Sequence, residues 1–166
     1  MPRGPHLSRT GFLACCVALA TWLVAPAAAD TLTYENARFG TLVVFPAELF
    51  SETMDPPENG DGMTWLAADG ASLAVYGMHN ALMVGPGELA DQAGAADGRP
   101  GFEVTYRRVG SDWVVLSGYE GDEVFYHRLE FGAGDVIHAM LMKYPAALKE
   151  KYDPLVGPIA ASLAGP

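Results

Sequence analysis

The chain has 166 residues, of which 50% are hydrophobic, and its 20 acidic and 10 basic residues give a formal net charge of −10. This length suits one domain with a real core, and the excess of acids argues against nucleic acid as a partner because like charges repel the phosphate backbone. Only two cysteines occur, Cys15 and Cys16, so a disulfide-rich framework is excluded.

The first 29 residues have the order of a cleaved export signal. Arg3 and Arg9 make a basic start, residues 11–25 form an apolar run, and residues 27–29 are three alanines before Asp30. The run is shorter than the roughly 20 residues that a membrane helix needs. We therefore expect cleavage after Ala29, a periplasmic or secreted product, and no stable membrane span. Two alternatives are a retained anchor and lipidation at a cysteine, although most of the apolar run follows the cysteines.

The expected mature chain, residues 30–166, is a single domain without cysteine. It keeps all 20 acids and 8 of the bases. Apolar burial must stabilise it, because neither disulfides nor thiolate metal sites can form.

Turn and strand signals alternate through the first half of this domain. The apolar run at residues 42–45 ends at Pro46, and Asp69-Gly70 is a hairpin signal. The first half is predicted to contain strands at 42–45, 63–67 and 73–78, a helical turn at 47–50, a short helix at 88–93, and loops at 55–62 and 95–101.

The second half predicts four successive strands, at residues 102–109, 113–118, 123–131 and 136–143. Their short connections favour antiparallel pairing. Residues 146–152 and 155–163 then predict a C-terminal helix, broken near Asp153-Pro154 and strained at Gly157-Pro158.

Two of these strands are apolar on both faces. Residues 113–116 read Trp-Val-Val-Leu, and residues 136–142 carry apolar side chains at both odd and even positions. Such a sheet must be covered on both sides. We therefore expect an α+β sandwich, with a central, mostly antiparallel sheet of five to seven strands and helices on both faces.

The acidic loop at residues 55–62 has two interpretations. Asp55, Glu58, Asn59 and Asp61 could supply oxygen ligands for calcium. Their spacing does not match the calcium-loop pattern, and Asn-Gly and Asp-Gly also suit a tight turn. The turn explains every residue present, so no metal site is predicted here.

His127 and His138 flank the hairpin loop at residues 132–135. A two-residue turn at Gly132-Ala133 would place the histidines opposite each other, whereas a four-residue loop would place His127 opposite Met140. A facing pair could share a metal, but no third ligand is evident. We expect both imidazoles to be core residues with hydrogen-bond partners.

No catalytic constellation is evident, and no cofactor is predicted. Ser117 lacks the G-x-S-x-G elbow of serine hydrolases, and neither a P-loop nor a dinucleotide-binding glycine pattern occurs. Several aromatic residues lie at strand spacing, which favours core and cross-strand packing over a ligand pocket: Tyr106, Trp113, Tyr119, Phe125 and Tyr126.

One sequence pattern begins with YENARFGT at residues 34–41 and continues with FP at 45–46, LF at 49–50 and NGDG at 59–62. It resembles the pattern of small exported bacterial proteins of unknown function. Later pieces at 105–107, 115–118, 125–126 and 144–145 fit the same group. This resemblance spans nearly the whole mature chain and implies no activity.

An early strand ending in Phe-Pro is followed by antiparallel strands, Tyr144-Pro145 and a helix ending in Ala-Ser-Leu at 161–163. This order of elements is similar to that of the PsbP-like family. The resemblance implies an α/β/α sandwich and an accessory or assembly role outside the cytoplasm. The family's photosystem ion-binding residues have no matching positions here, so it implies no site residue.

The leading hypothesis is an exported, non-enzymatic accessory or binding domain whose partner is an envelope protein or a small ligand. One alternative is a metal-binding protein or enzyme using His127 and His138. Another is a carbohydrate or envelope-surface binder, which needs Trp65, Trp113 or Tyr119 in an open groove.

Overall fold

The computed structural model describes Met1 and residues 30–166. The export signal expected at the start of the chain, with its cleavage site after Ala29, therefore lies outside the described residues. None of the helices in the described part is both long and apolar enough to cross a bilayer.

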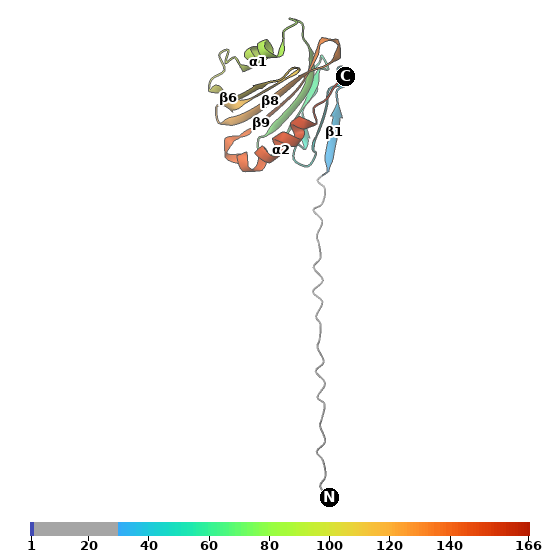
Figure 1. The fold of residues 1–166 in the computed structure, drawn as a ribbon, viewed down its shortest axis with the longest axis vertical. Coiled ribbons are helices and arrows are strands. Elements are labelled where there is room, and N and C mark those ends of the chain that lie inside the picture. Colours follow the sequence, from blue (N-terminus) through green and yellow to red (C-terminus); the bar gives the residue numbers. More distant parts are fainter. Residues whose placement is uncertain (2–29) are drawn as a thin grey trace.

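Seven strands form one antiparallel sheet in the order β3-β4-β5-β9-β8-β7-β6 (Figure 1). Their bounds are β3 (Glu52–Thr53), β4 (Gly62–Leu66), β5 (Ser72–His79), β6 (Phe102–Val109), β7 (Trp113–Glu120), β8 (Glu123–Phe131) and β9 (Val136–Pro145). The sheet confirms the predicted number and direction of strands. The Asp69-Gly70 signal does mark the turn between β4 and β5, where Gly70 has a φ of 93°.

A separate two-stranded hairpin lies outside this sheet. It consists of β1 (Thr31–Glu35) and β2 (Leu42–Pro46), which pair antiparallel. The strand expected at 42–45 is therefore present, but its partner is β1 rather than a strand of the central sheet. The hairpin is attached to the C-terminal segment by hydrogen bonds between the main chains of Leu42 and Ala164, at 2.8 and 3.0 Å.

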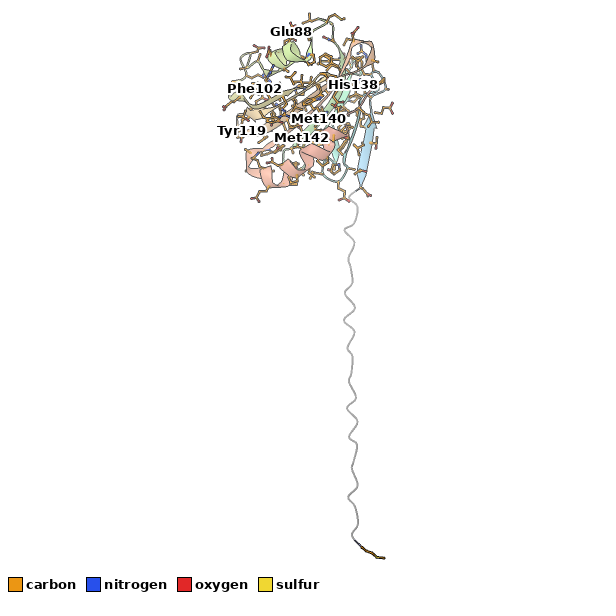
Figure 2. All side chains as sticks on the ribbon, in the orientation of Figure 1. Glu88, Phe102, Tyr119, His138, Met140 and Met142 are labelled. Atoms are coloured by element: carbon orange, nitrogen blue, oxygen red, sulfur yellow. The ribbon has the colours of Figure 1, made fainter. Side chains whose placement is uncertain are left out.

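Each face of the central sheet packs against its own layer. Helix α1 (Pro86–Gly94) covers one face, and helix α2 (Lys149–Ala161) together with the β1–β2 hairpin covers the other (Figure 1). Alternation along β9 divides its side chains between two cores. Met140 and Met142 are buried beneath α2, near the middle of the molecule in Figure 2, and Ile137 and Ala139 are buried beneath α1. The predicted α+β sandwich is confirmed.

Helix α2 is continuous where the sequence predicted a break. It passes through Pro154 and Pro158, and a 3₁₀ turn, η2 (Ala146–Leu148), precedes it. Burial of Tyr152, Val156 and Ile159 contributes about 1.5–3 kcal/mol per side chain, which offsets the roughly 3 kcal/mol that an interior proline costs. The expectation of a break at Asp153-Pro154 was wrong for this reason.

The β8–β9 register differs from both registers considered above. Phe131 pairs with Ile137 across a loop that contains the 3₁₀ turn η1 (Ala133–Asp135), in which Gly134 and Asp135 have positive φ. This longer loop places His127 opposite Leu141 and His138 opposite Glu130. The two imidazoles therefore lie on opposite faces of the sheet, and they cannot share a metal.

Candidate functional site

The acidic loop at residues 55–62 forms a turn. Gly60, at a φ of 64°, donates its N–H to the Pro57 carbonyl at 2.9 Å, and the Asn59 amide donates to the Asp61 carboxylate at 2.6 Å. Asp55, Glu58 and Asn59 are exposed. Within the described residues, no three histidine or carboxylate side chains gather as a metal site would require.

The loop is held from the side by the Y-x-N-x-R-F segment at residues 34–39. Buried Asn36 donates to the Gly60 carbonyl at 3.0 Å, and Arg38 donates to the Asn59 carbonyl at 2.7 Å. The Asn36 side-chain oxygen also accepts from the Arg38 and Phe39 N–H groups. The YENARFGT and NGDG segments of the sequence pattern therefore contact each other, and these contacts show that both segments have a structural role.

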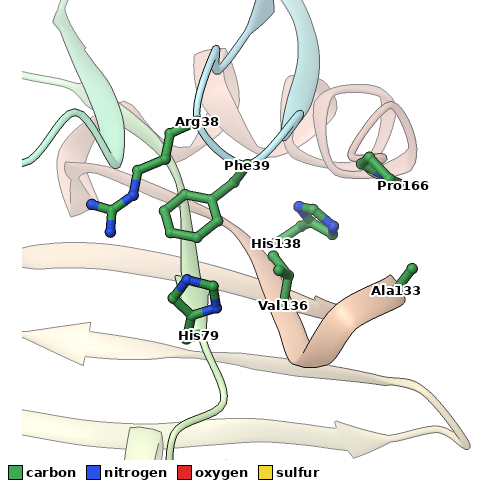
Figure 3. Close-up of a pocket in the computed structure, with 7 residues that line it drawn as sticks. All are labelled: Arg38, Phe39, His79, Ala133, Val136, His138 and Pro166. Atoms are coloured by element: carbon green, nitrogen blue, oxygen red, sulfur yellow. The ribbon is translucent and has the colours of Figure 1, made fainter.

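His138 anchors the β1–β2 hairpin to the central sheet. Its Nδ1 shares a hydrogen bond of 2.8 Å with the Thr41 hydroxyl, and the side chain is 2% exposed. A surface pocket of about 380 Å³ opens beside it, between Phe39, His79 and Pro166 (Figure 3).

The other nitrogen of His138, Nε2, has no hydrogen-bond partner in the described residues. Gly132 and Gly165 pack so closely around it that a Cβ on either would lie within 2.3 Å of Nε2. Burial lowers the pKa of His138, while the Pro166 carbonyl and the Glu130 carboxylate act in the opposite direction. The packing leaves no room for a ligand at Nε2, so the geometry favours an architectural histidine.

His127 lies on the α1 side of the sheet. Its Nε2 shares a hydrogen bond of 2.9 Å with the Tyr76 hydroxyl. Burial, with a smaller contribution from the Arg99 charge, lowers the pKa of His127 to about 4, and burial raises the pKa of Tyr76 to about 12. Both groups are therefore neutral near pH 7.

His127 lines a pocket of about 220 Å³ between the sheet and the segment that follows α1. We call this the His127 pocket, and its other main lining residues are Arg99, Phe102, Glu120, Phe125 and Lys143. The Lys143 ammonium lies 2.5 Å from the Glu120 carboxylate, and this contact lowers the pKa of Glu120. The Arg99 guanidinium lies 3.5 Å from the centre of the Phe102 ring, which stacks on Phe125.

Beyond α2, the opposite side of the sheet is partly open. Helix α2 lies over β8 and β9, and the side chains of β6 and β7 continue past it toward the sheet edge. We call this surface the aromatic face, and it is formed by Tyr106, Arg108, Trp113, Tyr119 and Arg128. Tyr106 is 50% exposed and Tyr119 is 36% exposed. Tyr119 lies at the periphery of the molecule in Figure 2.

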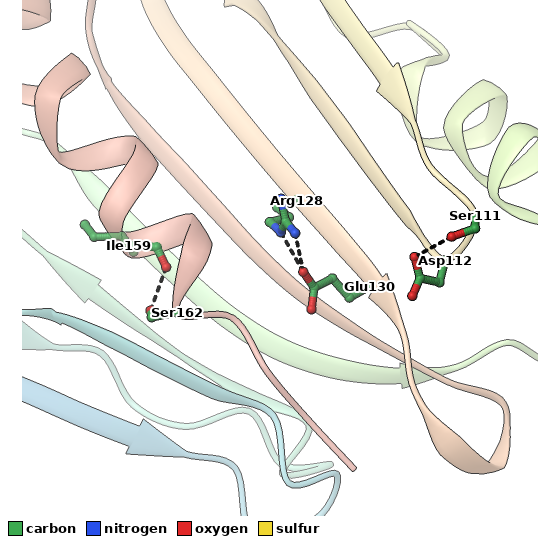
Figure 4. Close-up of polar contacts among 6 residues, drawn as sticks. All are labelled: Ser111, Asp112, Arg128, Glu130, Ile159 and Ser162. Atoms are coloured by element: carbon green, nitrogen blue, oxygen red, sulfur yellow. Dashed lines mark hydrogen bonds and ion pairs between the residues drawn. The ribbon is translucent and has the colours of Figure 1, made fainter.

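The charges of the aromatic face are arranged around Arg128. This side chain contacts Glu130 at 2.5 Å, to the side of α2 in Figure 4, and its guanidinium lies 5.4 Å from the centre of the Trp113 ring. Arg108 forms no ion pair within the described part of the chain. The face thus combines rigid aromatic rings with an arginine available to a partner.

The remaining predicted residues belong to the core or to main-chain contacts. Trp65 is 4% exposed and packs against Tyr34 and Phe45 beneath the β1–β2 hairpin, so it cannot line an open groove. The Ser117 hydroxyl donates to the Phe125 carbonyl at 2.7 Å, as a structural serine does.

Comparisons with known proteins show the fold. No protein-family model matches the chain, and no curated protein matches its sequence. Among solved structures, the chain is similar to cyanobacterial PsbP (CyanoP) from Synechocystis sp. PCC 6803, with a TM-score of 0.60 and 10% sequence identity over 93% of this chain and 99% of that chain. The PsbP-like fold expected from the order of elements is confirmed.

Sequence reasoning missed the His127 pocket because its polar residues come from separate elements. Arg99 follows α1, Glu120 lies on β7, and Lys143 lies on β9. No local spacing connects them. The one available signal was the presence of polar residues at inward positions of otherwise apolar strands.

Proposed function

We propose that this chain is an exported, non-enzymatic accessory domain that binds a partner protein through the aromatic face. The observation that carries the proposal is the composition of this open sheet surface. Tyrosine, tryptophan and arginine are the residues most enriched at the energetic centres of protein interfaces. Here they lie together on rigid strands, where binding would cost little conformational entropy.

Charge indicates the kind of partner. The aromatic face carries two bases, Arg108 and Arg128, and two acids, Glu103 and Glu130. Glu130 pairs with Arg128, whereas Arg108 forms no ion pair within the described residues. We infer a partner protein that presents carboxylate side chains to Arg108 and apolar surface to Tyr106 and Tyr119. Electrostatic complementarity of this kind would favour the correct orientation and speed association.

Two further observations support the proposal. The fold is similar to that of cyanobacterial PsbP, and the resemblance to PsbP-like domains implies accessory roles outside the cytoplasm. The export signal expected at residues 1–29 fits the same location. Membership of the small exported group carrying the YENARFGT pattern is part of this proposal.

The test is a pull-down from the envelope extract of the host, with mature protein as bait. We expect a protein that is recovered with the wild type and lost with Arg108→Glu and with Tyr119→Ala. The matched control is Arg107→Glu, because Arg107 is the neighbouring residue on the opposite face, where it pairs with Asp91 at 2.8 Å. Recovery that is insensitive to Arg108 and Tyr119, or recovery of the bait alone, would contradict the proposal.

The same variants test the carbohydrate alternative. Trp113 and Tyr119 lie on the aromatic face, which is the observation in its favour, although Arg128 lies against the Trp113 ring. If the wild-type protein were retained on envelope polysaccharide and the Tyr119→Ala variant were not, the partner of the aromatic face would be a glycan and not a protein. A shared site of His127 and His138 is not proposed, since they lie on opposite faces of the sheet.

A further inference from the structure

The His127 pocket differs from the rest of the molecule in its charge. Two of the mature chain's eight basic residues, Arg99 and Lys143, line it together with a single acid, Glu120. The pocket lies on the α1 side of the sheet, away from the aromatic face. What it binds is therefore a separate question from the accessory role proposed above.

The two cations are held in place by the protein. Arg99 donates to the main-chain oxygens of Ala93 and Ala95 at the end of α1 and stacks on Phe102, and Lys143 pairs with Glu120. A fixed guanidinium loses little entropy when it pairs with an incoming carboxylate, and its planar fork matches that group.

The uncharged residues that line the His127 pocket suit the apolar part of a ligand. Phe102 and Phe125 stack with ring centroids 4.9 Å apart, and Leu141 lies opposite His127 in the next strand. His127 uses Nε2 for Tyr76, which leaves Nδ1 as the ring nitrogen that can contact a ligand. Small-molecule sites combine apolar walls with a few fixed polar groups in this way.

We propose that the His127 pocket binds a small organic carboxylate, with the carboxylate directed to Arg99 and Lys143 and a compact apolar body against Phe102, Phe125 and Leu141. The volume of about 220 Å³ limits the ligand to roughly the size of one substituted ring or a short branched acid. A ligand this small binds weakly, so a millimolar dissociation constant is expected.

Benzoate is the probe, with benzamidine as its cationic counterpart and benzyl alcohol as its neutral one. The readout is the NMR titration of the His127 ring, which faces Tyr76, Arg99, Glu120 and Lys143. We expect benzoate to shift the ring resonances in a saturable manner and to raise the pKa of His127, because a bound anion opposes the field of Arg99. Benzamidine should produce neither effect.

Variants locate the site. Arg99→Gln should weaken benzoate binding at least about tenfold, which corresponds to loss of a charge-assisted contact. Arg108→Gln, on the opposite face, is the matched control and should leave binding unchanged. Lys143→Gln is a second variant if Arg99→Gln fails to fold.

Three outcomes would overturn the proposal. They are an absence of saturable shifts with benzoate, equal shifts with benzamidine, and binding that survives both Arg99→Gln and Lys143→Gln. Each can occur whether or not the aromatic face binds a protein, so this test and the pull-down fail independently.

Discussion

At the scale of single residues, the two strand histidines show how sheet geometry separates identical side chains. His127 and His138 are on adjacent strands, yet one contacts Tyr76 under α1 and the other contacts Thr41 under the β1–β2 hairpin. Burial lowers the pKa of both. Each therefore favours a neutral imidazole in the folded state, which makes the fold sensitive to acid.

The first prediction concerns this acid sensitivity. The pKa of His127 is about 4 in the folded chain, below the 6.5 expected when unfolded, so between these values only the unfolded state takes up the proton. The contribution of neutral His127 to the free energy of unfolding is complete above pH 6.5 and is lost as the pH falls toward 4. The loss due to this group is at most about 3 kcal/mol.

Urea denaturation at pH 7 and pH 5 measures this loss. We expect His127→Gln to lose less stability than the wild type between these two values. His79→Gln is the matched control, because His79 is exposed. A His127→Gln slope equal to that of the wild type would mean that the pKa of His127 is not lowered in the folded chain, which would contradict the prediction.

At the scale of elements, α2 forms despite its sequence because tertiary contacts hold it. Its buried side chains pack on the sheet, and the Tyr152 hydroxyl donates to Asp69 at 2.5 Å, next to the Lys151–Asp69 ion pair. These contacts lower the pKa of Asp69 and join the helix to the β4–β5 turn. The prolines lie on the outer side, where Pro154 and Pro158 are exposed.

The second prediction follows from the exposure of Pro154. Pro154→Ala restores a helical N–H donor and removes a steric conflict without loss of packing, so it should raise the free energy of unfolding by about 1–3 kcal/mol. Thermal and urea denaturation would measure the gain. Pro56→Ala is the control, because Pro56 lies in the exposed loop outside any helix. A destabilised Pro154→Ala protein would contradict a continuous helix at this position.

At the scale of the whole molecule, one sheet serves two cores. The strands β5, β8 and β9 contribute to both, and each face needs its own cover. On the α2 side the cover ends before β6, which leaves the aromatic face open. Residues 30–166 contain no cysteine, so apolar burial in these two cores, and not disulfide bonding, is the main source of stability.

The third prediction concerns where this molecule works. We propose that expression in a Gram-negative host gives a soluble periplasmic product whose intact mass corresponds to residues 30–166. Ala29→Arg should block cleavage, because signal processing requires a small residue at this position. The control is Asp30→Ala, which leaves the small-residue site intact. A product that retains Met1, or that carries a lipid on Cys15 or Cys16, would contradict the prediction.

The sequence by itself determined the class of fold. Apolar side chains on both faces of β7 and β9 required a covering layer on each face of the sheet. The short connections required antiparallel neighbours, and the turn residues located the β4–β5 hairpin. These features are local or repeat along a strand, so one sequence is enough to read them.

Only the tertiary structure decided the register, the continuity of α2 and the sites. A loop one residue longer than expected moved His127 and His138 to opposite faces, because side chains alternate at every residue of a strand. Packing on the sheet overcame the prolines of α2. The His127 pocket and the aromatic face depend on which distant strands become neighbours, and that arrangement is set by the whole chain.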